Sequence, residues 1–165
     1  MRDPESQLRQ CCRGRVCFVA LGSTDAGDDA FGILLARKLA TGAEAGSEWR
    51  VLVAGVGPER CLSLLTQRTF DNVVFLDAAE IGAAPGSVAL LNAEEMNSRN
   101  PQVSTHRISL GLLAKMVEGS GPTKAWLLAA QPESLRRGAA LSEPVAQAVE
   151  LVHQLLARTS EEVPC

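Results

Sequence analysis

Short apolar runs alternate along the chain with segments of helical periodicity, and this alternation constrains the fold more than any other feature. Five runs have the length and the boundary residues of β-strands: residues 15–22, 49–55, 72–78, 86–92 and 124–130. Their apolar residues are nearly continuous, which is typical of strands that are buried on both faces. Strands that alternate with helices in this way predict an α/β fold with a sheet covered on both sides.

Four segments carry the spacing of helices, and two of them have clear start signals. The predicted helices span residues 28–40, 58–67, 106–118 and 142–158. Asp28 is a candidate N-cap of the first and Ser142 of the last, where Pro144 is tolerated in the first turn. Helical spacing places apolar side chains on one face of the third and fourth helices. These are Ile108, Leu112 and Met116 in the third helix, and Val145, Val149, Val152 and Leu156 in the fourth.

The connection between the third and fourth strands determines how the fourth strand runs. Only residues 79–85 separate the two strands. A parallel crossover needs about a dozen residues or more, whereas an antiparallel connection can be short. The fourth strand is therefore predicted to be antiparallel to the rest of the sheet.

Length and composition predict one domain with short tails. The chain has 165 residues, of which 46% are hydrophobic, and this is the size of a single domain with a substantial core. Residues 1–14 are polar without apolar periodicity and are predicted to be a flexible tail. The domain is then expected to span residues 15–159, and residues 160–165 form a C-terminal tail.

Charge and cysteine content exclude several classes of protein and favour one compartment. A net charge of −3 offers no basic stripe for nucleic acid. The apolar run at residues 16–21 is too short to span a membrane. The 5 cysteines have no CxxC spacing, which favours reduced thiols in the cytoplasm. The adjacent Cys11 and Cys12 have poor geometry for a metal and are interpreted as incidental tail residues.

The segment "GSTDAGDDAFG", residues 22–32, joins the first strand to the first helix and invites three interpretations. Its glycine spacing matches neither dinucleotide nor P-loop motifs, and its three aspartates would repel a phosphate. The two other interpretations, a paired-carboxylate catalytic centre and a metal site, remain open. The alternative to both is that the aspartates are helix-capping residues favoured by the helix dipole.

Carboxylates and a histidine are expected to meet at one edge of the sheet. Asp29 follows the first strand, Asp77 ends the third, and His106 stands at the start of the third helix. Ligands of α/β sheets bind at the carboxyl ends of the parallel strands. Two carboxylates and one imidazole suit a borderline divalent ion such as nickel or zinc. Residues 56–58 and 131–134 are candidate cleft walls, with a turn and a helix start as the alternatives. No GxSxG motif supports a serine nucleophile.

The order of several motifs resembles the hydrogenase maturation endopeptidases. The motifs are "LGSTDAGDDAFG", "VLVAGVGPE", "VVFLDAAEIGAAPGSV", "STHRISLGLLAKM", "QPESL" and "LSEPVAQAVELV", which together span about residues 16–156. The resemblance implies a three-layer α/β/α sandwich around a five-stranded mixed sheet whose fourth strand is antiparallel. Two positions depart from the family pattern. Ser23 replaces a usual asparagine, and Asp25 replaces a hydrophobic residue.

The resemblance also implies an activity and roles for individual residues. Members of the family remove a C-terminal extension from the large-subunit precursor of nickel–iron hydrogenase after nickel insertion. By motif, Asp29, Asp77 and His106 correspond to the residues that meet nickel, which the precursor itself supplies. A metal-dependent endopeptidase is thus expected, with these three residues both as metal ligands and as the catalytic set. Asp29 is favoured over Asp28 as the general base.

Two other functions fit the same sequence. One is a binding module that inspects nickel loading in the precursor without cutting it. The other is a small-molecule hydrolase or phosphorylase of similar architecture, because a fold alone does not determine function. A nucleotide enzyme should offer cationic groups at the strand ends, whereas the residues expected there are mainly acidic. The oligomeric state is left open by the sequence.

Overall fold

The computed structural model describes residues 3–42, 48–67, 70–99 and 109–161, and its centre is one mixed sheet. The strands are β1 (Val16–Leu21), β2 (Trp49–Gly55), β3 (Asn72–Ala78), β4 (Val88–Asn92) and β5 (Lys124–Ala130). They are ordered β2-β1-β3-β5-β4. β4 pairs with β5 in the antiparallel direction, whereas β1, β2, β3 and β5 run parallel. The short connection after β3 therefore predicted the direction of β4 correctly.

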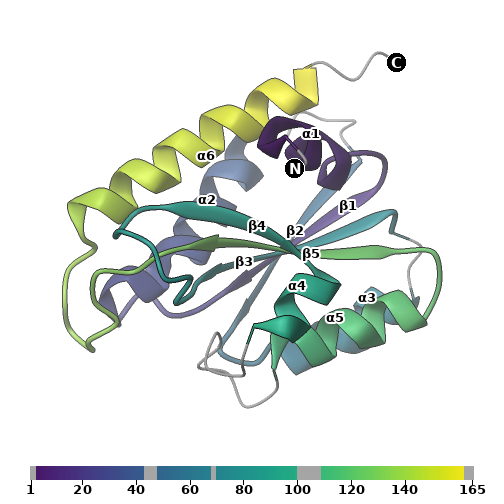
Figure 1. Ribbon diagram of the computed structural model, residues 1–165, viewed down its shortest axis with the longest axis horizontal. Coiled ribbons are helices and arrows are strands. Elements are labelled where there is room, and N and C mark those ends of the chain that lie inside the picture. The colour runs from purple at the N-terminus through teal and green to yellow at the C-terminus, as the bar shows by residue number, and fades with distance from the viewer. Residues whose placement is uncertain (1–2, 43–47, 68–69, 100–108, 162–165) are drawn as a thin grey trace.

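Helices cover both faces of the sheet and make the three layers that were predicted (Figure 1). On one face lie α1 (Pro4–Cys11), α2 (Phe31–Gly42) and α6 (Glu143–Glu161), and on the other lie α3 (Leu62–Gln67), α4 (Ala93–Ser98) and α5 (Leu110–Gly119). Short 3₁₀ turns, η1 (Gly27–Ala30) and η2 (Pro58–Cys61), precede α2 and α3. No helix in the described part of the chain is long and apolar enough to cross a membrane.

The central strands are fully buried and the edge strand β2 is not. All residues of β1 and β3 are buried, and their alternate side chains enter the two core layers. On α6, the predicted stripe of Val145, Val149, Val152 and Leu156 is between 0% and 3% exposed and packs into one of these layers. Burial on both faces is the wrong expectation for β2, where Arg50 and Val53 are exposed. β2 pairs with β1 on one side only, so its other side is an open edge.

The N-terminal segment forms a packed helix instead of the predicted flexible tail. α1 begins at Pro4 after Asp3, and Pro at the first helical position is a known start signal. Its end is buried: Cys11 is 0% exposed and Cys12 is 3% exposed. These cysteines belong to the core layer of α2 and α6 and are not incidental tail residues.

Helix α4 was not predicted from the sequence, although the residues at its start form a recognisable capping signal. Asn92 Oδ1 accepts a hydrogen bond from the Glu95 backbone N–H, and Glu95 Oε2 accepts one from the Asn92 N–H. This reciprocal pair is a capping box, and the sequence N-x-x-E predicts it. This helix has only six residues, so its apolar residues are too few to show a helical periodicity.

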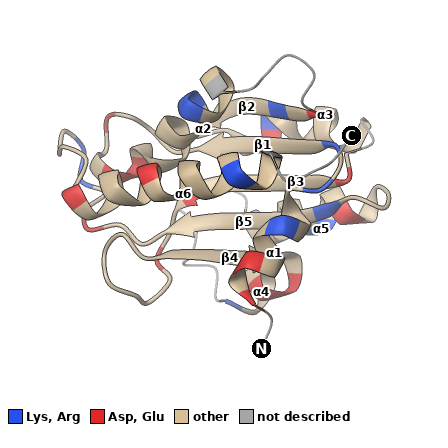
Figure 2. Cartoon of the chain, turned by 90° about the horizontal axis from the view of Figure 1, so that it is seen from above, with Lys and Arg blue, Asp and Glu red and all other residues tan. Residues whose placement is uncertain are grey.

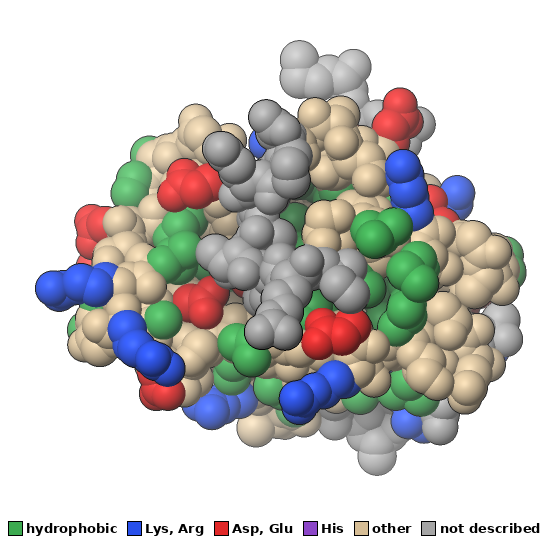
Figure 3. All heavy atoms as spheres, turned by 90° about the horizontal axis from the view of Figure 1, so that it is seen from below, with side chains coloured by type: hydrophobic (Ala, Val, Ile, Leu, Met, Phe, Trp, Pro, Cys, Tyr) green, Lys and Arg blue, Asp and Glu red, His purple; other side chains and the backbone are tan. Residues whose placement is uncertain are grey.

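Helix α5 buries a different face from the one predicted. Leu112 and Met116 are 49% and 44% exposed, whereas Leu110, Leu113 and Val117 are buried against the sheet. Ile108 lies outside the described residues. α5 has apolar side chains on both of these faces, so periodicity alone could not select the buried one. Hydrophobic side chains remain visible on the surface that carries α3, α4 and α5 (Figure 3).

Candidate functional site

The loop after β1 turns back so that Asp29 lies beside the end of that strand. Gly22 has a φ of +103°, and a Cβ atom there would lie 2.0 Å from the backbone oxygen of Asp29. Only glycine fits this turn. The Ser23 N–H donates to the same Asp29 oxygen at 3.2 Å, and the Ser23 hydroxyl accepts from the Asp25 N–H. Ser23, which stands where the family usually has asparagine, thus makes hydrogen bonds within the loop.

A second close approach brings the start of α2 onto the ends of two strands. A Cβ atom on Gly32 would lie 2.2 Å from the Leu76 backbone oxygen and 2.8 Å from that of Leu21. The first turn of α2 thus rests on the carboxyl ends of β1 and β3, which are neighbours in the sheet. Asp77 directly follows Leu76. The structure therefore brings Asp29, in η1 after β1, and Asp77, in β3, to the same edge of the sheet.

Asp77 is a carboxylate in the interior of the molecule. Its residue is 1% exposed and pairs in register with Ala129 of β5. The alternation along β3 points it to the same side as Val73 and Phe75, whose side chains face the layer of α3, α4 and α5. Burying a carboxylate lowers stability unless it is paired, hydrogen-bonded or bound to a cation. Asp77 thus places a carboxylate inside the molecule at the carboxyl end of β3, the end at which α/β sheets bind ligands.

Asp29 is half-buried, and the third predicted ligand lies outside the described residues. Asp29 Oδ1 lies 3.1 Å from the position that a Cβ atom on Gly22 would take. His106 precedes Ser109, the N-cap of α5, by three positions in the sequence, and α5 covers the face toward which Asp77 points. Within the described ranges, no group of three or more His, Cys, Asp or Glu side chains could hold a metal ion. The predicted set of three thus remains a prediction, with two members at one edge.

The sequence predicted that Asp28 caps its own helix, and this prediction is wrong. Its carboxylate instead binds a segment that is distant in the sequence. Asp28 is 0% exposed, and its carboxylate accepts hydrogen bonds from the backbone N–H groups of Glu133, Ser134 and Ser142 and from the Ser142 hydroxyl. Burial raises the pKa of Asp28, but the hydrogen bonds from Ser142, Glu133 and Ser134 outweigh this effect and lower its pKa below the ordinary 3.8. Asp28 is therefore an ionised structural group.

Gln131 is a second buried polar residue that joins loops at this edge. It is 5% exposed; its Oε1 accepts from the Ile81 N–H at 2.8 Å, and its Nε2 donates to Glu80 Oε2 at 2.9 Å. Its backbone N–H and C=O bond to Ser87 and Gly86. Gln131 thus fixes the connection after β3 to the connection after β5. The candidate wall at residues 131–134 is built around this contact, and no helix starts there. In the other candidate wall, residues 56–58, Val56 is 73% exposed and η2 begins at Pro58.

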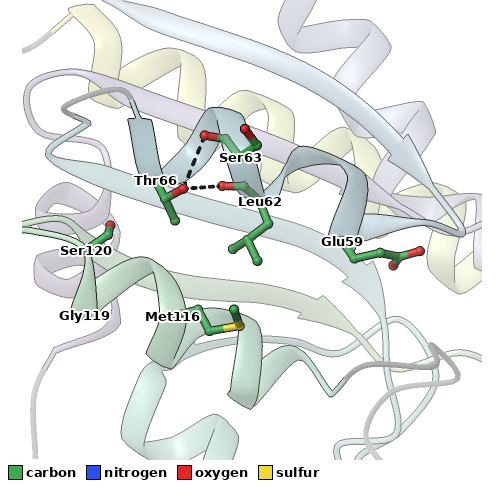
Figure 4. Close-up of a pocket in the computed structure, with 7 residues that line it drawn as sticks. All are labelled: Glu59, Leu62, Ser63, Thr66, Met116, Gly119 and Ser120. Atoms are coloured by element: carbon green, nitrogen blue, oxygen red, sulfur yellow. Dashed lines mark hydrogen bonds between the residues drawn. The ribbon is translucent and has the colours of Figure 1, made fainter.

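A groove of about 680 Å³ lies apart from this edge, between α3 and α5. Leu62 and Met116 point toward each other across it (Figure 4). The Thr66 hydroxyl donates to the backbone oxygens of Leu62 and Ser63. Neither Asp29 nor Asp77 lines the groove, so it is not the predicted site. The lining residues are Glu59, Leu62, Ser63, Thr66, Met116, Gly119 and Ser120.

The described cysteines are reduced thiols, and two of them are neighbours in the core. Cys11, Cys12, Cys17 and Cys61 form no disulfide, and the Sγ atoms of Cys11 and Cys12 are 3.8 Å apart. The hydrogen bond between Cys11 and Cys12, together with burial, raises the pKa of Cys11, whereas the same hydrogen bond lowers the pKa of Cys12. Lys and Arg residues, coloured blue in the cartoon of Figure 2, are spread over several elements of the described chain.

An α/β/α sandwich with carboxylates at the carboxyl ends of its parallel strands belongs to the class of α/β proteins that bind their ligands at this edge. Within that class, the family model of the hydrogenase maturation protease HycI matches residues 33–159. The chain belongs to the hydrogenase maturation protease family and is an endopeptidase that processes the large subunit of nickel–iron hydrogenase. The match includes Asp77 and His106 and begins after Asp29.

Solved structures of family members have the same fold. The [NiFe] hydrogenase maturation protease HycI from Thermococcus kodakarensis has 25% identity and a TM-score of 0.83, over 94% of this chain and 99% of that one. The endopeptidase HycI from Escherichia coli has 25% identity and a TM-score of 0.72, over 88% and 90%. The maturating endopeptidase HybD from Escherichia coli has 24% identity and a TM-score of 0.74, over 90% and 93%. No curated protein matches the chain in sequence.

Proposed function

We propose that this endopeptidase removes the C-terminal extension of the hydrogenase large-subunit precursor after nickel insertion, and that Asp29, Asp77 and His106 bind the nickel that the precursor carries. The observation that carries the proposal is the Asp77 carboxylate, which is 1% exposed at the carboxyl end of β3. A carboxylate at the carboxyl end of a parallel strand lies where α/β sheets bind their ligands, and its oxygens are suitable ligands for a divalent cation. Asp29 lies at the same edge, and two oxygen ligands with one imidazole suit nickel.

Hydrolysis of the extension adds one water molecule across a peptide bond. The hydroxyl joins the carbonyl carbon, and a proton passes to the nitrogen of the leaving amine. A divalent cation supplies Lewis acidity, which polarises the carbonyl or lowers the pKa of a bound water. Asp29 is the stronger candidate for the general base because it is half-buried. Asp28 is fully buried and its oxygens accept four hydrogen bonds, so it is not available for proton transfer.

The proposed substrate is a protein, and the proposed compartment is the cytoplasm. Nickel is cargo of the precursor in this scheme, so the enzyme uses it as a signal that the large subunit is loaded. The reduced state of the four described cysteines supports a cytoplasmic location.

A cleavage assay with the genuine substrate tests the proposal. Purified protein is mixed with nickel-loaded large-subunit precursor, and the mass of the precursor is followed. Loss of the tail is expected with the wild type, and almost none with Asp77→Ala or His106→Ala. His153→Ala is the matched control, because His153 lies on α6 in the opposite layer.

The outcomes separate the rival functions. A wild type that binds the loaded precursor without cutting it would be the nickel-inspecting module. Unchanged cleavage by Asp77→Ala or His106→Ala would contradict the ligand assignment and leave the endopeptidase activity intact.

A further inference from the structure

The carboxylate of Asp28 is enclosed by one segment far away in the sequence. Ser142 N–H donates to Oδ1 at 2.7 Å, while Glu133 N–H at 2.7 Å, Ser134 N–H at 3.2 Å and the Ser142 hydroxyl at 2.9 Å donate to Oδ2. All these donors belong to the connection between β5 and α6. The residue itself is 0% exposed, so water does not compete for these hydrogen bonds.

Backbone hydrogen bonds extend this contact along both segments. The Asp28 N–H donates to the Ser134 oxygen at 2.9 Å, and the Gly138 N–H donates to the Asp25 oxygen at 2.7 Å. The loop after β1 and the connection after β5 are thus joined at Asp28 and again at Asp25. This joined pair of segments, residues 25–28 and 133–142, is called the edge clamp below.

Asp29 follows the edge clamp directly. Its N–H donates to the Ala26 oxygen at 3.1 Å, and its oxygen accepts from the Ser23 N–H at 3.2 Å. Both partners lie in the same loop, so they move with it. A displacement of the edge clamp is therefore expected to displace Asp29 as well.

The chemistry of the clamp requires a carboxylate and not an amide. All four partners of Asp28 are donors, and an ionised carboxylate is an acceptor at every position. Asparagine has the same shape but would turn an N–H₂ group toward at least one N–H donor. The clamp therefore retains a buried negative charge next to Asp29, at an edge that already holds Asp77, although a neutral residue would be cheaper to bury.

We propose that Asp28 is a positioning residue for the cleavage reaction: its carboxylate holds the connection after β5 against the loop after β1 and thereby fixes Asp29 for the metal. This inference rests on the proposed function of Asp29. Asp28 itself touches neither substrate nor metal.

The test compares two reciprocal, shape-conserving substitutions in the full-length protein. Asp28→Asn changes the clamp. Asn72→Asp is the matched control, because Asn72 is a buried hydrogen-bonding residue, 6% exposed, at the amino ends of the strands. Both variants are expected to be less stable than the wild type. Cleavage of nickel-loaded precursor is measured well below the unfolding midpoint of every variant, together with hydrogen exchange of residues 23–30.

Only Asp28→Asn is expected to affect the reaction and the loop. Its kcat should fall about 10- to 100-fold, the range typical of residues that orient metal ligands, with KM nearly unchanged. Hydrogen exchange in residues 23–30 should become faster. Asn72→Asp should keep the wild-type kcat and the wild-type exchange in this segment. If Asp28→Asn does not fold, Ser142→Ala removes only the hydroxyl donor and should show the same two changes at smaller size.

The results distinguish this inference from the proposed function. A kcat of Asp28→Asn within twofold of the wild type overturns the positioning role, and so does an equal loss of kcat in Asn72→Asp. If the wild type itself does not cleave the precursor, the proposed function fails. Hydrogen exchange then decides alone, and unchanged exchange in residues 23–30 overturns the clamp.

Discussion

The two edges of the sheet are both held together by buried polar side chains, but of opposite character. At the amino edge, Asn72 donates to the backbone oxygens of Gln10 and Arg13 and accepts from the Trp126 indole N–H at 2.8 Å. At the carboxyl edge, Asp28 accepts four hydrogen bonds as an ionised carboxylate. The amino edge thus uses a neutral amide, whereas the carboxyl edge uses a buried charge in addition to the neutral amide of Gln131.

The difference between the two edges shows that the cost of burying charge is concentrated at the carboxyl edge. A neutral amide satisfies donors and acceptors at once and joins α1, β3 and β5 without a buried charge. The carboxyl edge instead concentrates Asp28, Asp29 and Asp77, of which Asp28 and Asp77 are 0% and 1% exposed. Like charges in a poorly solvated region repel one another. Sequences violate such rules mainly at functional sites, and the carboxyl edge is the one at which the metal site is proposed.

The largest expected effect comes from neutralising Asp77. Asp77→Asn keeps the shape of the side chain but removes the charge that a cation would require. Cleavage of the precursor should fall by about 100-fold or more, in the range of lost catalytic groups. Denaturant unfolding is measured beside the cleavage assay, so that the rate is compared under conditions in which both proteins are folded. Cleavage by folded Asp77→Asn at the wild-type rate would contradict the proposed role of Asp77.

Truncating the uncharged hydrogen-bonding residue of each edge should separate stability from activity. Gln131→Ala and Asn72→Ala each leave buried partners without their hydrogen bonds and should cost about 1–3 kcal/mol. Only Gln131→Ala should also lower kcat, because Gln131 joins the connections after β3 and β5. The two kcat values are compared at temperatures equally far below each variant's unfolding midpoint. Equal values would contradict a functional distinction between the two edges.

Acid should weaken the carboxyl edge and leave the amino edge unchanged. The folded-state pKa of Asp28 is lowered from 3.8, so its stabilising effect is complete above that value and is lost as the pH falls through the folded-state pKa. The difference in unfolding free energy between the wild type and Asp28→Asn should therefore shrink below about pH 4. The difference between the wild type and Asn72→Ala should not follow this pattern. Denaturant unfolding at several pH values measures both differences.

The smallest effect is expected from a single hydrogen bond at the amino edge. The hydroxyl of Thr123, a residue that is 4% exposed, donates to the Phe70 oxygen at 2.5 Å. Thr123→Val keeps the shape and removes the donor, which should cost about 1 kcal/mol. Cleavage should remain at the wild-type rate. A measurable loss of kcat here would show that the amino edge also affects the reaction.

Most of the architecture was predictable because it depends on short-range patterns. The strand at residues 72–78 was identified within its exact bounds, and the seven-residue connection 79–85 predicted that β4 is antiparallel. The faces of helices were less predictable. The buried stripe of α6 was correct because its opposite face is polar, whereas α5 has apolar side chains on two faces and the wrong one was chosen.

The candidate site was only partly predictable. Asp77 was identified because a carboxylate directly after a buried apolar run is unusual, and the structure places it at the expected edge. Asp28 was misread because its partners lie more than 100 positions away, at Glu133, Ser134 and Ser142. Gln131 was considered only as a cleft wall or a helix start. A local sequence pattern cannot predict contacts between residues that are so far apart in the sequence.

The sequence by itself determined the class of fold, the direction of each strand and the family, because these follow from periodicity, connection lengths and the order of motifs. The tertiary structure decided which aspartate of the glycine-rich loop is buried and which is half-exposed. Asp28 and Asp29 are neighbours of the same chemical type. Asp28 is a structural residue because the connection between β5 and α6 supplies hydrogen-bond donors to its carboxylate. Asp29, one position later, is half-buried at the same edge, where we propose that it binds the metal.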